Sequence, residues 1–486
     1  MRKIMNQKRP IVAYVDAICG SGKSTTLQQY IKSSLLTNAD AIPPRYLLVM
    51  PTHELCEQVK SELEHMGVRS YHVDIELNAV KHLTTTLEND FQHSVIICTH
   101  ECFKHYCYRA EFETELQRLL KDFSVFIDEI PDAMFGAYIK ATHTDRTEEN
   151  FPFIKWLEEK DGLLFLNESY RDDLYKYWHE KQANGEELKR LLWAILQGAG
   201  LLYEENKHLF AFTASPIIKS AQWAENLTVL GAGSSRSLFT WAAENVAGYT
   251  VSEAGEHLQP PVERRHHKRG AITLMAVCEN RCTLTSLQHV FNERLQEIIR
   301  RVPGEFIFAT NRDKSICEFT TIGDEILSDG VRGERVSMAS YGLNHYQHMH
   351  NAVFLGCSNL DRDFQGKWRQ YADLNGWNVE EFEQKQRAAM NYERCYQFIS
   401  RTSIRNADTD HPLVFVVPDL ATAEYIREYY FPGASIECFN FEKPRKKVKG
   451  NETRERIQEC KVQGMTQKSA AEMLQVNIKT IKRNWN

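Results

Sequence analysis

A glycine-rich stretch near the start of the chain holds the residues best suited to bind phosphate. The residues D-A-I-C-G-S-G-K-S-T-T occupy positions 16–26, between the apolar run I-V-A-Y-V and a helical pattern that begins at Lys23. A loop between a strand and a helix can surround phosphates with backbone N–H groups and with the positive end of the helix. Lys23 would reach the β- and γ-phosphates, and the Ser24 hydroxyl would bind Mg²⁺. The predicted nucleotide contacts in this loop are Ala17, Gly20, Ser21, Gly22, Lys23, Ser24 and Thr25.

Two adjacent carboxylates, Asp128 and Glu129, follow the apolar stretch F-S-V-F-I. Carboxylates at the end of a buried strand can bind Mg²⁺ and orient a water molecule for attack on a phosphate. We expect Asp128 to bind the metal and Glu129 to orient the water. Together with the phosphate loop, this pair predicts an enzyme that hydrolyses a nucleoside triphosphate, with ATP and Mg²⁺ as its ligands.

The second half of the chain contains no phosphate loop of its own, but it does contain the stretch Q-F-I-S-R-T-S-I-R at 397–405. This stretch resembles the last conserved motif of superfamily 2 helicases, which implies that Gln397, Arg401 and Arg405 are catalytic residues. On a helix the two arginines would face the same way because they are four residues apart, and which of them meets the γ-phosphate stays open. An arginine supplied across an interface neutralises charge in phosphoryl transfer and raises the rate by roughly 10³–10⁵.

The order of these stretches resembles that of superfamily 2 helicases, in which alanine commonly replaces the first glycine of the phosphate loop, as Ala17 does here. P-T-H-E-L at 51–55, T-H at 99–100, T-A-S at 213–215 and S-M-A-S-Y-G-L-N at 337–344 stand in the order of further helicase motifs. The resemblance implies nucleic-acid contacts at Pro51, Thr52, Thr99, His100, Thr213 and Ser215. It also implies nucleotide contacts at Gly342 and Asn344.

Apolar strands alternate with helical patterns along most of the chain, which predicts an α/β fold of two RecA-like parallel-sheet domains in tandem. The first domain is expected at 1–235, with a helical insertion at about 135–207, and a linker at 236–270. The second is expected at 271–442, with four apolar strands and no phosphate loop.

The end of the chain differs in charge from the rest. Residues 443–486 contain 12 Lys or Arg and 4 Asp or Glu, whereas the whole chain has a net charge of −6. After a basic linker at 443–450, residues 451–486 predict three helices that resemble the helix-turn-helix of transposases and phage regulators. Its third helix would enter the DNA major groove with Lys479, Thr480, Lys482 and Arg483.

Together these features predict an ATP-dependent DNA helicase or translocase that holds single-stranded DNA between its domains and duplex DNA at its tail. Twelve cysteines without a signal peptide, and no apolar run long enough to span a membrane, favour the cytoplasm of a bacterium or of a phage-infected host. Replication proteins are candidate partners, in phage or mobile-element replication or recombination. The open alternatives are an RNA helicase and a DNA-binding regulator that uses its NTPase half as a switch. A small-molecule kinase is disfavoured because it would not use arginines from a second domain.

Overall fold

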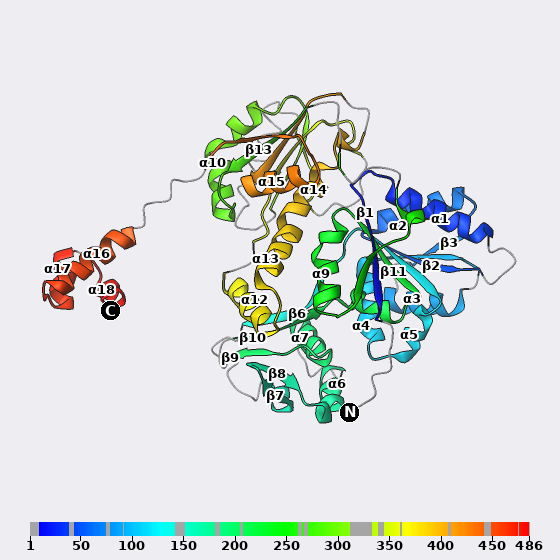
Figure 1. The fold of residues 1–486 in the computed structure, drawn as a ribbon, viewed down its shortest axis with the longest axis horizontal. Helices are drawn as coiled ribbons and strands as arrows, with labels where there is room; N and C mark the ends of the chain where they lie inside the picture. The colour runs from blue at the N-terminus through cyan, green and yellow to red at the C-terminus, as the bar shows by residue number, and fades with distance from the viewer. Residues whose placement is uncertain are drawn as a thin grey trace.

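The computed structural model describes residues 9–37, 43–73, 78–90, 92–140, 151–179, 185–204, 208–260, 265–266, 271–311, 333–338, 345–359, 362–406, 410–441, 449–474 and 476–485. Two wholly parallel sheets dominate these residues, as Figure 1 shows. Among the helices in this part of the chain, none is both long and apolar enough to cross a membrane.

The first sheet contains seven parallel strands in the order β12-β1-β11-β5-β2-β4-β3. Its central strands are buried apolar runs, as expected for a parallel sheet covered on both faces, whereas the edge strand at residues 250–253 is partly polar and not buried. The strands are β1 (Ile11–Asp16), β2 (Arg45–Met50), β3 (Ser70–His72), β4 (Val95–Thr99), β5 (Phe123–Asp128), β11 (Asn226–Gly231) and β12 (Thr250–Glu253). The helices of this domain are α1 (Lys23–Thr37), α2 (His53–His65), α3 (Ala79–Asn89), α4 (His100–Ala110), α5 (Thr114–Leu120), α8 (Pro216–Lys219) and α9 (Leu238–Asn245).

The first domain extends beyond the boundary expected at residue 235. Strand β12 pairs with β1, with Thr250 opposite Ile11. The His257 ring stacks on Tyr30 of α1 with ring centres 4.7 Å apart. Residues 236–258 were therefore assigned to the linker incorrectly, because a four-residue strand with alternating polar residues resembles a loop in sequence.

The insertion in the first domain is mixed rather than helical, which corrects the expectation for 135–207. It contains a three-stranded antiparallel sheet in the order β6-β10-β9 and a hairpin of β7 and β8 beside two helices. These elements are β6 (Met134–Lys140), β7 (Leu157–Lys160), β8 (Leu163–Leu166), α6 (Arg171–His179), α7 (Glu186–Leu196), β9 (Leu202–Glu204) and β10 (His208–Ala214).

The second sheet contains six parallel strands in the order β15-β14-β16-β17-β13-β18. The four strands predicted from apolar runs are confirmed, and two short edge strands are added. The elements are β13 (Ile272–Cys278), α10 (Leu284–Arg300), β14 (Phe306–Thr310), β15 (Gly333–Arg335), β16 (Asn351–Leu355), α14 (Glu393–Ile399), β17 (Leu413–Asp419), α15 (Leu420–Tyr429) and β18 (Ser435–Cys438).

Two helices leave the second sheet after β16; the first lies beside β6 and β10 and the second beside α9 (Figure 1). We call α12 (Arg362–Leu374) and α13 (Val379–Arg387) the arm. Trp368, Tyr371 and Phe382 of the arm are buried in the same apolar cluster as residues of the first domain. A π-helical turn, Ala388–Tyr392, joins the arm to α14. The arm therefore belongs to the second domain in sequence and to the first domain in packing.

The tail forms the three predicted helices, α16 (Lys449–Val462), α17 (Gln467–Leu474) and α18 (Ile478–Asn484). Their common core includes Ile457, Ala470 and Ile481, which are buried. The Thr466 side chain accepts a hydrogen bond from the Ser469 amide at 3.2 Å, so it caps α17 as its residue type predicts.

Candidate nucleotide-binding site

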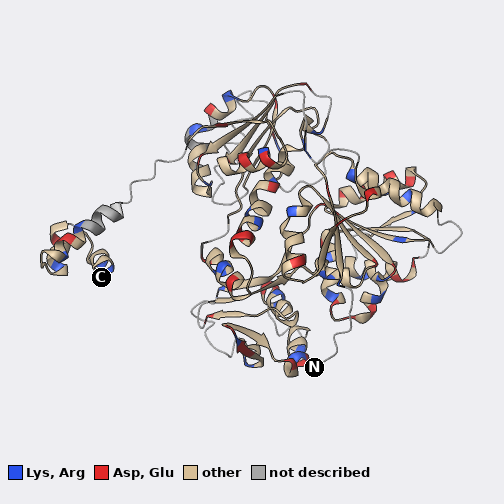
Figure 2. Cartoon of the chain, in the orientation of Figure 1, with Lys and Arg blue, Asp and Glu red and all other residues tan. Residues whose placement is uncertain are grey.

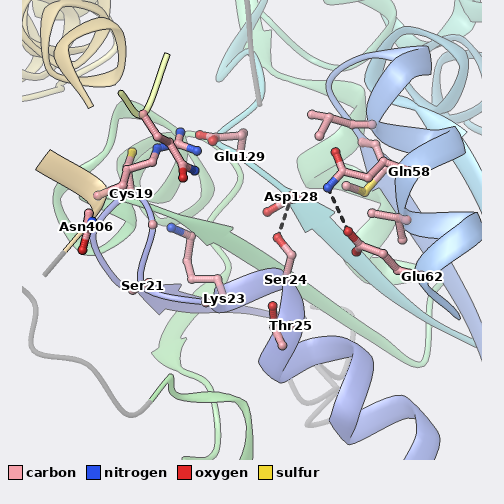
Figure 3. Close-up of a pocket in the computed structure, with 17 residues that line it drawn as sticks. Cys19, Ser21, Lys23, Ser24, Thr25, Gln58, Glu62, Asp128, Glu129 and Asn406 are labelled. Carbon is pink, nitrogen blue, oxygen red and sulfur yellow. Dashed lines mark hydrogen bonds between the residues drawn. The ribbon is translucent and has the colours of Figure 1, made fainter. Parts of the chain in front are cut away.

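The predicted phosphate loop lines a cavity of about 480 Å³ at the junction of the two sheets (Figure 3). Gly20 and Gly22 have φ angles of +79° and +84°, which favour glycine, and α1 begins at Lys23. The cavity size lies within the usual range for small-molecule sites. Its lining residues are Cys19, Gly20, Ser21, Gly22, Lys23, Ser24, Thr25, Met50, Leu55, Gln58, Val59, Glu62, Asp128, Glu129, Gln347, Arg405 and Asn406.

Two polar groups of the loop are suited to phosphate oxygens. The Lys23 ammonium donates to the carbonyl oxygens of Ala17 and Ile18, both at 3.0 Å, so one of its three N–H groups remains for a ligand. The Ser21 hydroxyl is buried and has no hydrogen-bond partner among the described residues. Because an unpaired buried hydroxyl is unfavourable, a phosphate oxygen at this place would fit the loop.

Ser24 and Asp128 lie together at the position expected for Mg²⁺. The Ser24 hydroxyl donates to Asp128 Oδ2 at 3.1 Å, as Figure 3 shows. The pKa of Asp128 is raised to about 6, mainly by burial and also by the neighbouring Glu129, while Lys23 and the Ser24 hydrogen bond oppose the rise. In the part of the chain described, no group of three or more His, Cys, Asp or Glu could hold a metal. One carboxylate and one hydroxyl fit Mg²⁺ that is also bound by nucleotide phosphates.

Glu129 has an unusual backbone conformation for a residue with a side chain. Its φ angle is +65°, and its amide donates to the Leu230 carbonyl at 2.8 Å. Such conformations cluster at functional sites, where the surrounding structure holds them in place. The Gln397 side chain, from α14 of the second domain, donates to Glu129 Oε2 at 3.2 Å. Gln397 can therefore orient the carboxylate predicted to orient the attacking water.

The two arginines predicted for the cavity lie in different places. Arg405 lines the cavity, and a side-chain carbon built on Gly20 would come within 2.9 Å of Arg405 Cγ. Arg401 is buried in the second domain and donates to the Ser337 carbonyl at 3.3 Å. They do not share a helix face, because α14 ends at Ile399. Arg405, and not Arg401, is the arginine positioned to meet a phosphate.

The predicted contacts Gly342 and Asn344 lie outside the described residues. Gln347, from the turn that follows them, lines the cavity together with Asn406. On the opposite wall, Glu62 of α2 accepts hydrogen bonds from Gln28 and Gln58. Sequence analysis missed the cavity residues Gln58, Glu62, Gln347 and Asn406, because single amides and carboxylates on helices or turns carry no motif.

Thr99 and His100 are both predicted to contact nucleic acid; in the structure Thr99 caps α4 and His100 contacts Asp128. Thr99 is buried and its hydroxyl accepts from the Cys102 amide at 3.2 Å. The His100 Nε2 hydrogen-bonds the Asp128 carbonyl at 2.8 Å, and burial lowers the pKa of His100 to about 4. By contrast, Pro51 and Thr52 are half-buried at the start of α2, where their predicted contact with nucleic acid remains a prediction.

Thr213 and Ser215, the other predicted nucleic-acid contacts, are buried at the end of β10, outside the sheet of the phosphate loop. The strand between β1 and β5 is β11. The loop after it, residues 231–236, contacts the end of β1, with the Gly233 amide donating to Asp16 Oδ1 at 2.8 Å. Since β10 does not belong to the sheet of the phosphate loop, the contact of Thr213 and Ser215 with nucleic acid stays a prediction.

In the tail, Lys479, Lys482 and Arg483 of α18 are exposed, and Thr480 is half-buried. Figure 2 shows the basic side of this helix next to the C-terminus. This arrangement is compatible with the predicted contact with DNA, which stays a prediction.

Comparison with known proteins supports the sequence resemblance in the first third of the chain. No curated protein sequence matches this chain. The solved structures that resemble it include an XPD structure titled XPD_APO, with 11% identity over 88% of this chain and 97% of that one and a TM-score of 0.44. They also include Dbp5 of S. cerevisiae bound to RNA and ADP BeF3, with 10% identity over 89% and 86% and a TM-score of 0.40. RecG bound to a three-way DNA junction has 12% identity over 88% and 42% and a TM-score of 0.34. Residues 1–144, which hold the phosphate loop and both carboxylates, match the DEAD/DEAH box helicase family.

Proposed function

We propose that the protein is an ATP-dependent DNA helicase or translocase of superfamily 2. The observation that carries this proposal is the composition of the cavity: Lys23 and Ser24 come from the first domain, at the start of α1, and Arg405 comes from the second domain. A site assembled from two domains is complete only when they are together. Hydrolysis can therefore drive a change in their relative position.

Each polar residue of the cavity has its own role in the proposed hydrolysis of ATP. Lys23 and the loop amides bind the phosphates, and Ser24 and Asp128 hold Mg²⁺, which neutralises phosphate charge when bound. Glu129 orients the attacking water, and Arg405 neutralises the charge that develops on the transferred phosphate.

The tail supports DNA as the polymer on which the motor acts. A basic exposed face on the last helix of a three-helix unit suits the phosphates and base edges of duplex DNA. We place single-stranded DNA against Pro51 and Thr52. Work in phage or mobile-element replication or recombination, in the cytoplasm, and with replication proteins as partners, would suit a motor that carries its own DNA-targeting unit.

ATP hydrolysis by the full chain, measured with single-stranded DNA, duplex DNA or RNA, tests the proposal. We expect stimulation by DNA and its loss in Lys23→Ala. Stimulation by RNA alone would instead indicate an RNA helicase, and DNA-dependent activity that survives Lys23→Ala would indicate a regulator.

The role of the tail is tested by replacing Lys479, Lys482 and Arg483 with alanine. We expect weaker duplex binding and unchanged stimulation by single strands. Alanine at the exposed Lys461 and Lys468 of the same unit is the charge control, and an equal loss there would contradict a specific role for α18.

A further inference from the structure

Arg236 belongs to the first domain but is bound by side chains of the second. It follows β11, and its guanidinium carbon lies 4.4 Å from the ring centre of Tyr429 and 4.8 Å from that of Tyr430. Its Nε donates to the Tyr425 hydroxyl at 3.2 Å, and its Nη2 lies 3.6 Å from Glu393 Oε1. An arginine between aromatic faces and a carboxylate is held both by cation–π attraction and by an ion pair.

Glu393 is the acceptor at the centre of this contact. Its carboxylate accepts hydrogen bonds from the hydroxyls of Tyr425, at 2.5 Å, and Tyr430, at 2.6 Å. Burial raises the pKa of Glu393, whereas the charge of Arg236 and the two hydroxyls oppose the rise. A buried carboxylate is unfavourable without a nearby cation. The ion pair with Glu393 therefore stabilises Arg236 in its position against the second domain.

Glu393 shares one face of α14 with two residues that contact the nucleotide-binding region. Tyr396 and Gln397 follow it by three and four positions, which places all three on the same side of the helix. The Tyr396 hydroxyl accepts from the amide of Cys19 in the phosphate loop at 3.1 Å. Gln397 donates to Glu129 at 3.2 Å. A displacement of α14 at Glu393 would therefore change both contacts.

On the side of the first domain, Asp16 connects Arg236 to the phosphate loop. Asp16 ends β1 directly before the loop, and its carboxylate accepts from the Gly233 amide at 2.8 Å and from the Ser235 hydroxyl. The same carboxylate lies 3.9 Å from Arg236 Nη1. Arg236 is thus fixed relative to the nucleotide cavity, although it does not line that cavity.

We propose that Arg236 is a positioning residue for ATP hydrolysis. With Glu393 it forms a latch between the domains, and the closed latch places α14 so that Gln397 meets Glu129. This inference rests on the proposed function, because it assumes that ATP is hydrolysed in the cavity. In this proposal Arg236 and Glu393, which do not line the nucleotide cavity, control whether the residues of the first and second domains meet at the site.

Kinetics of Arg236→Gln, Glu393→Gln and the double variant test the latch. We expect Arg236→Gln to lower the DNA-stimulated kcat by about 10–100-fold, the usual range of coupling between sites. Nucleotide affinity without DNA should change much less than kcat, because Lys23, Ser24 and the loop amides that would bind the phosphates belong to the first domain. The double variant should be no slower than Arg236→Gln alone, since both changes break one contact. Arg236→Lys should keep part of kcat, because the charge remains but the stacking is lost.

Arg109→Gln is the control, because Arg109 forms an exposed ion pair with Glu113 and lines neither the nucleotide cavity nor the contact with α14. A kcat of Arg236→Gln equal to that of the control, or additive losses in the double variant, would overturn the latch. If Arg236→Gln does not fold, the Glu393→Gln variant alone tests the latch. The amide oxygen of the new glutamine can still accept the hydrogen bonds of Tyr425 and Tyr430. A lower kcat with a much smaller change in nucleotide affinity would then support the latch, and an unchanged kcat would overturn it.

Energy transfer between two dyes separates the latch from the proposed function. One dye is attached at Leu36→Cys on α1 and the other at the exposed Cys438 of β18, with Cys317, which lies outside the described residues, changed to serine. We expect lower transfer in Arg236→Gln than in the otherwise identical chain. Lower transfer in a protein that hydrolyses no ATP would support the latch while refuting the proposed function. Unchanged transfer together with normal hydrolysis by the parent chain would refute the latch alone.

Discussion

The two α/β domains meet at two places that differ in chemistry. At the first, which we call the nucleotide seam, the phosphate loop, Glu129 and Arg236 face α14, α15 and Arg405. Its contacts include hydrogen bonds and ion pairs, such as Gln397 to Glu129, beside small apolar contacts of Ile18, Cys19 and Ala232. At the second, the arm contact, residues 362–387 pack on β10 and α9 through aromatic rings.

The rings of the arm contact are buried and close-packed. The ring centres of Phe210 and Trp368 lie 5.0 Å apart, and those of Trp241 and Phe382 lie 5.1 Å apart. Aromatic side chains bury large apolar areas, and such contacts are costly to expose to water. Hydrogen bonds at a seam can be exchanged for bonds to water at a small net cost.

This difference indicates which contact opens during a cycle of hydrolysis. The arm contact would stay in place while the nucleotide seam opens and closes. The π-helical turn Ala388–Tyr392 lies between the two, where α13 of the arm continues into α14 of the seam. Because π-helical turns are frequent sites of bending, movement at the seam is expected to bend the chain there.

The largest effect is expected at the seam, from Arg405→Ala. Loss of the arginine that we propose neutralises the transferred phosphate should lower kcat by roughly 10³–10⁵, with little change in thermal stability. The measurement is DNA-stimulated ATP hydrolysis at saturating nucleotide, beside a thermal unfolding curve.

Arg401→Ala is the matched comparison, because Arg401 is buried and donates to the Ser337 carbonyl. Its removal should lower the unfolding temperature of the second domain more than Arg405→Ala does. Equal loss of kcat in the two variants at equal stability would show that both arginines serve the phosphates, contrary to the assignment of Arg405.

The next largest effect is expected in the arm contact. Trp368→Ala removes a buried ring that packs on Phe210 and Phe212, and such truncations cost about 3–5 kcal/mol of unfolding free energy. The loss of unfolding free energy is measured by denaturant unfolding, monitored by the circular dichroism of the backbone because the substitution removes a tryptophan. Leu36→Ala, at a side chain that is 70% exposed, is the control and should change little. If Trp368→Ala left stability unchanged, the arm would not be a fixed attachment.

The contrast also explains how much could be read from the sequence. The phosphate loop and the strand before Asp128 were recognised because each is a short contiguous pattern. The arm contact gave no such signal, because it joins distant residues: the Tyr371 hydroxyl donates toward the Gly200 carbonyl, 171 positions away. The apolar run of β10 predicted a strand correctly but could not indicate the sheet to which the strand belongs.

The end of α14 was misjudged for a different physical reason. A helical spacing of Arg401 and Arg405 assumes that the helix continues past residue 400. Instead, the Ser400 hydroxyl donates to the Tyr396 carbonyl at 2.7 Å and the Thr402 hydroxyl donates to the Ile399 carbonyl at 2.8 Å. Hydroxyl side chains that bond the nearby backbone compete with helix hydrogen bonds. The position of the arginines depends on these local bonds.

An intermediate effect is expected when a tyrosine is changed to phenylalanine, in one variant at the arm contact and in another at the nucleotide seam. Tyr371→Phe removes a hydroxyl that lies 2.9 Å from the carbonyl oxygens of Gly200 and Phe212. It should cost about 1–3 kcal/mol of unfolding free energy, because buried carbonyls lose a donor. Tyr396→Phe removes the acceptor of the Cys19 amide, so it should lower kcat more than Tyr371→Phe does. The reverse ranking of the two variants in kcat would contradict the division between a fixed contact and a working seam.

The smallest effect is expected at the charged rim of the arm contact, where Lys140 lies 3.7 Å from Asp363 and both side chains are about two-thirds exposed. Both signs of charge are mixed along the arm (Figure 2). Exposed ion pairs contribute only about 0–1 kcal/mol, because water and salt screen them. Lys140→Ala should therefore change the unfolding free energy by less than Tyr371→Phe, and the change should shrink further at high salt. A loss as large as that of Trp368→Ala would mean that charge, and not aromatic packing, fastens the arm, and raising the salt concentration should then release the second domain.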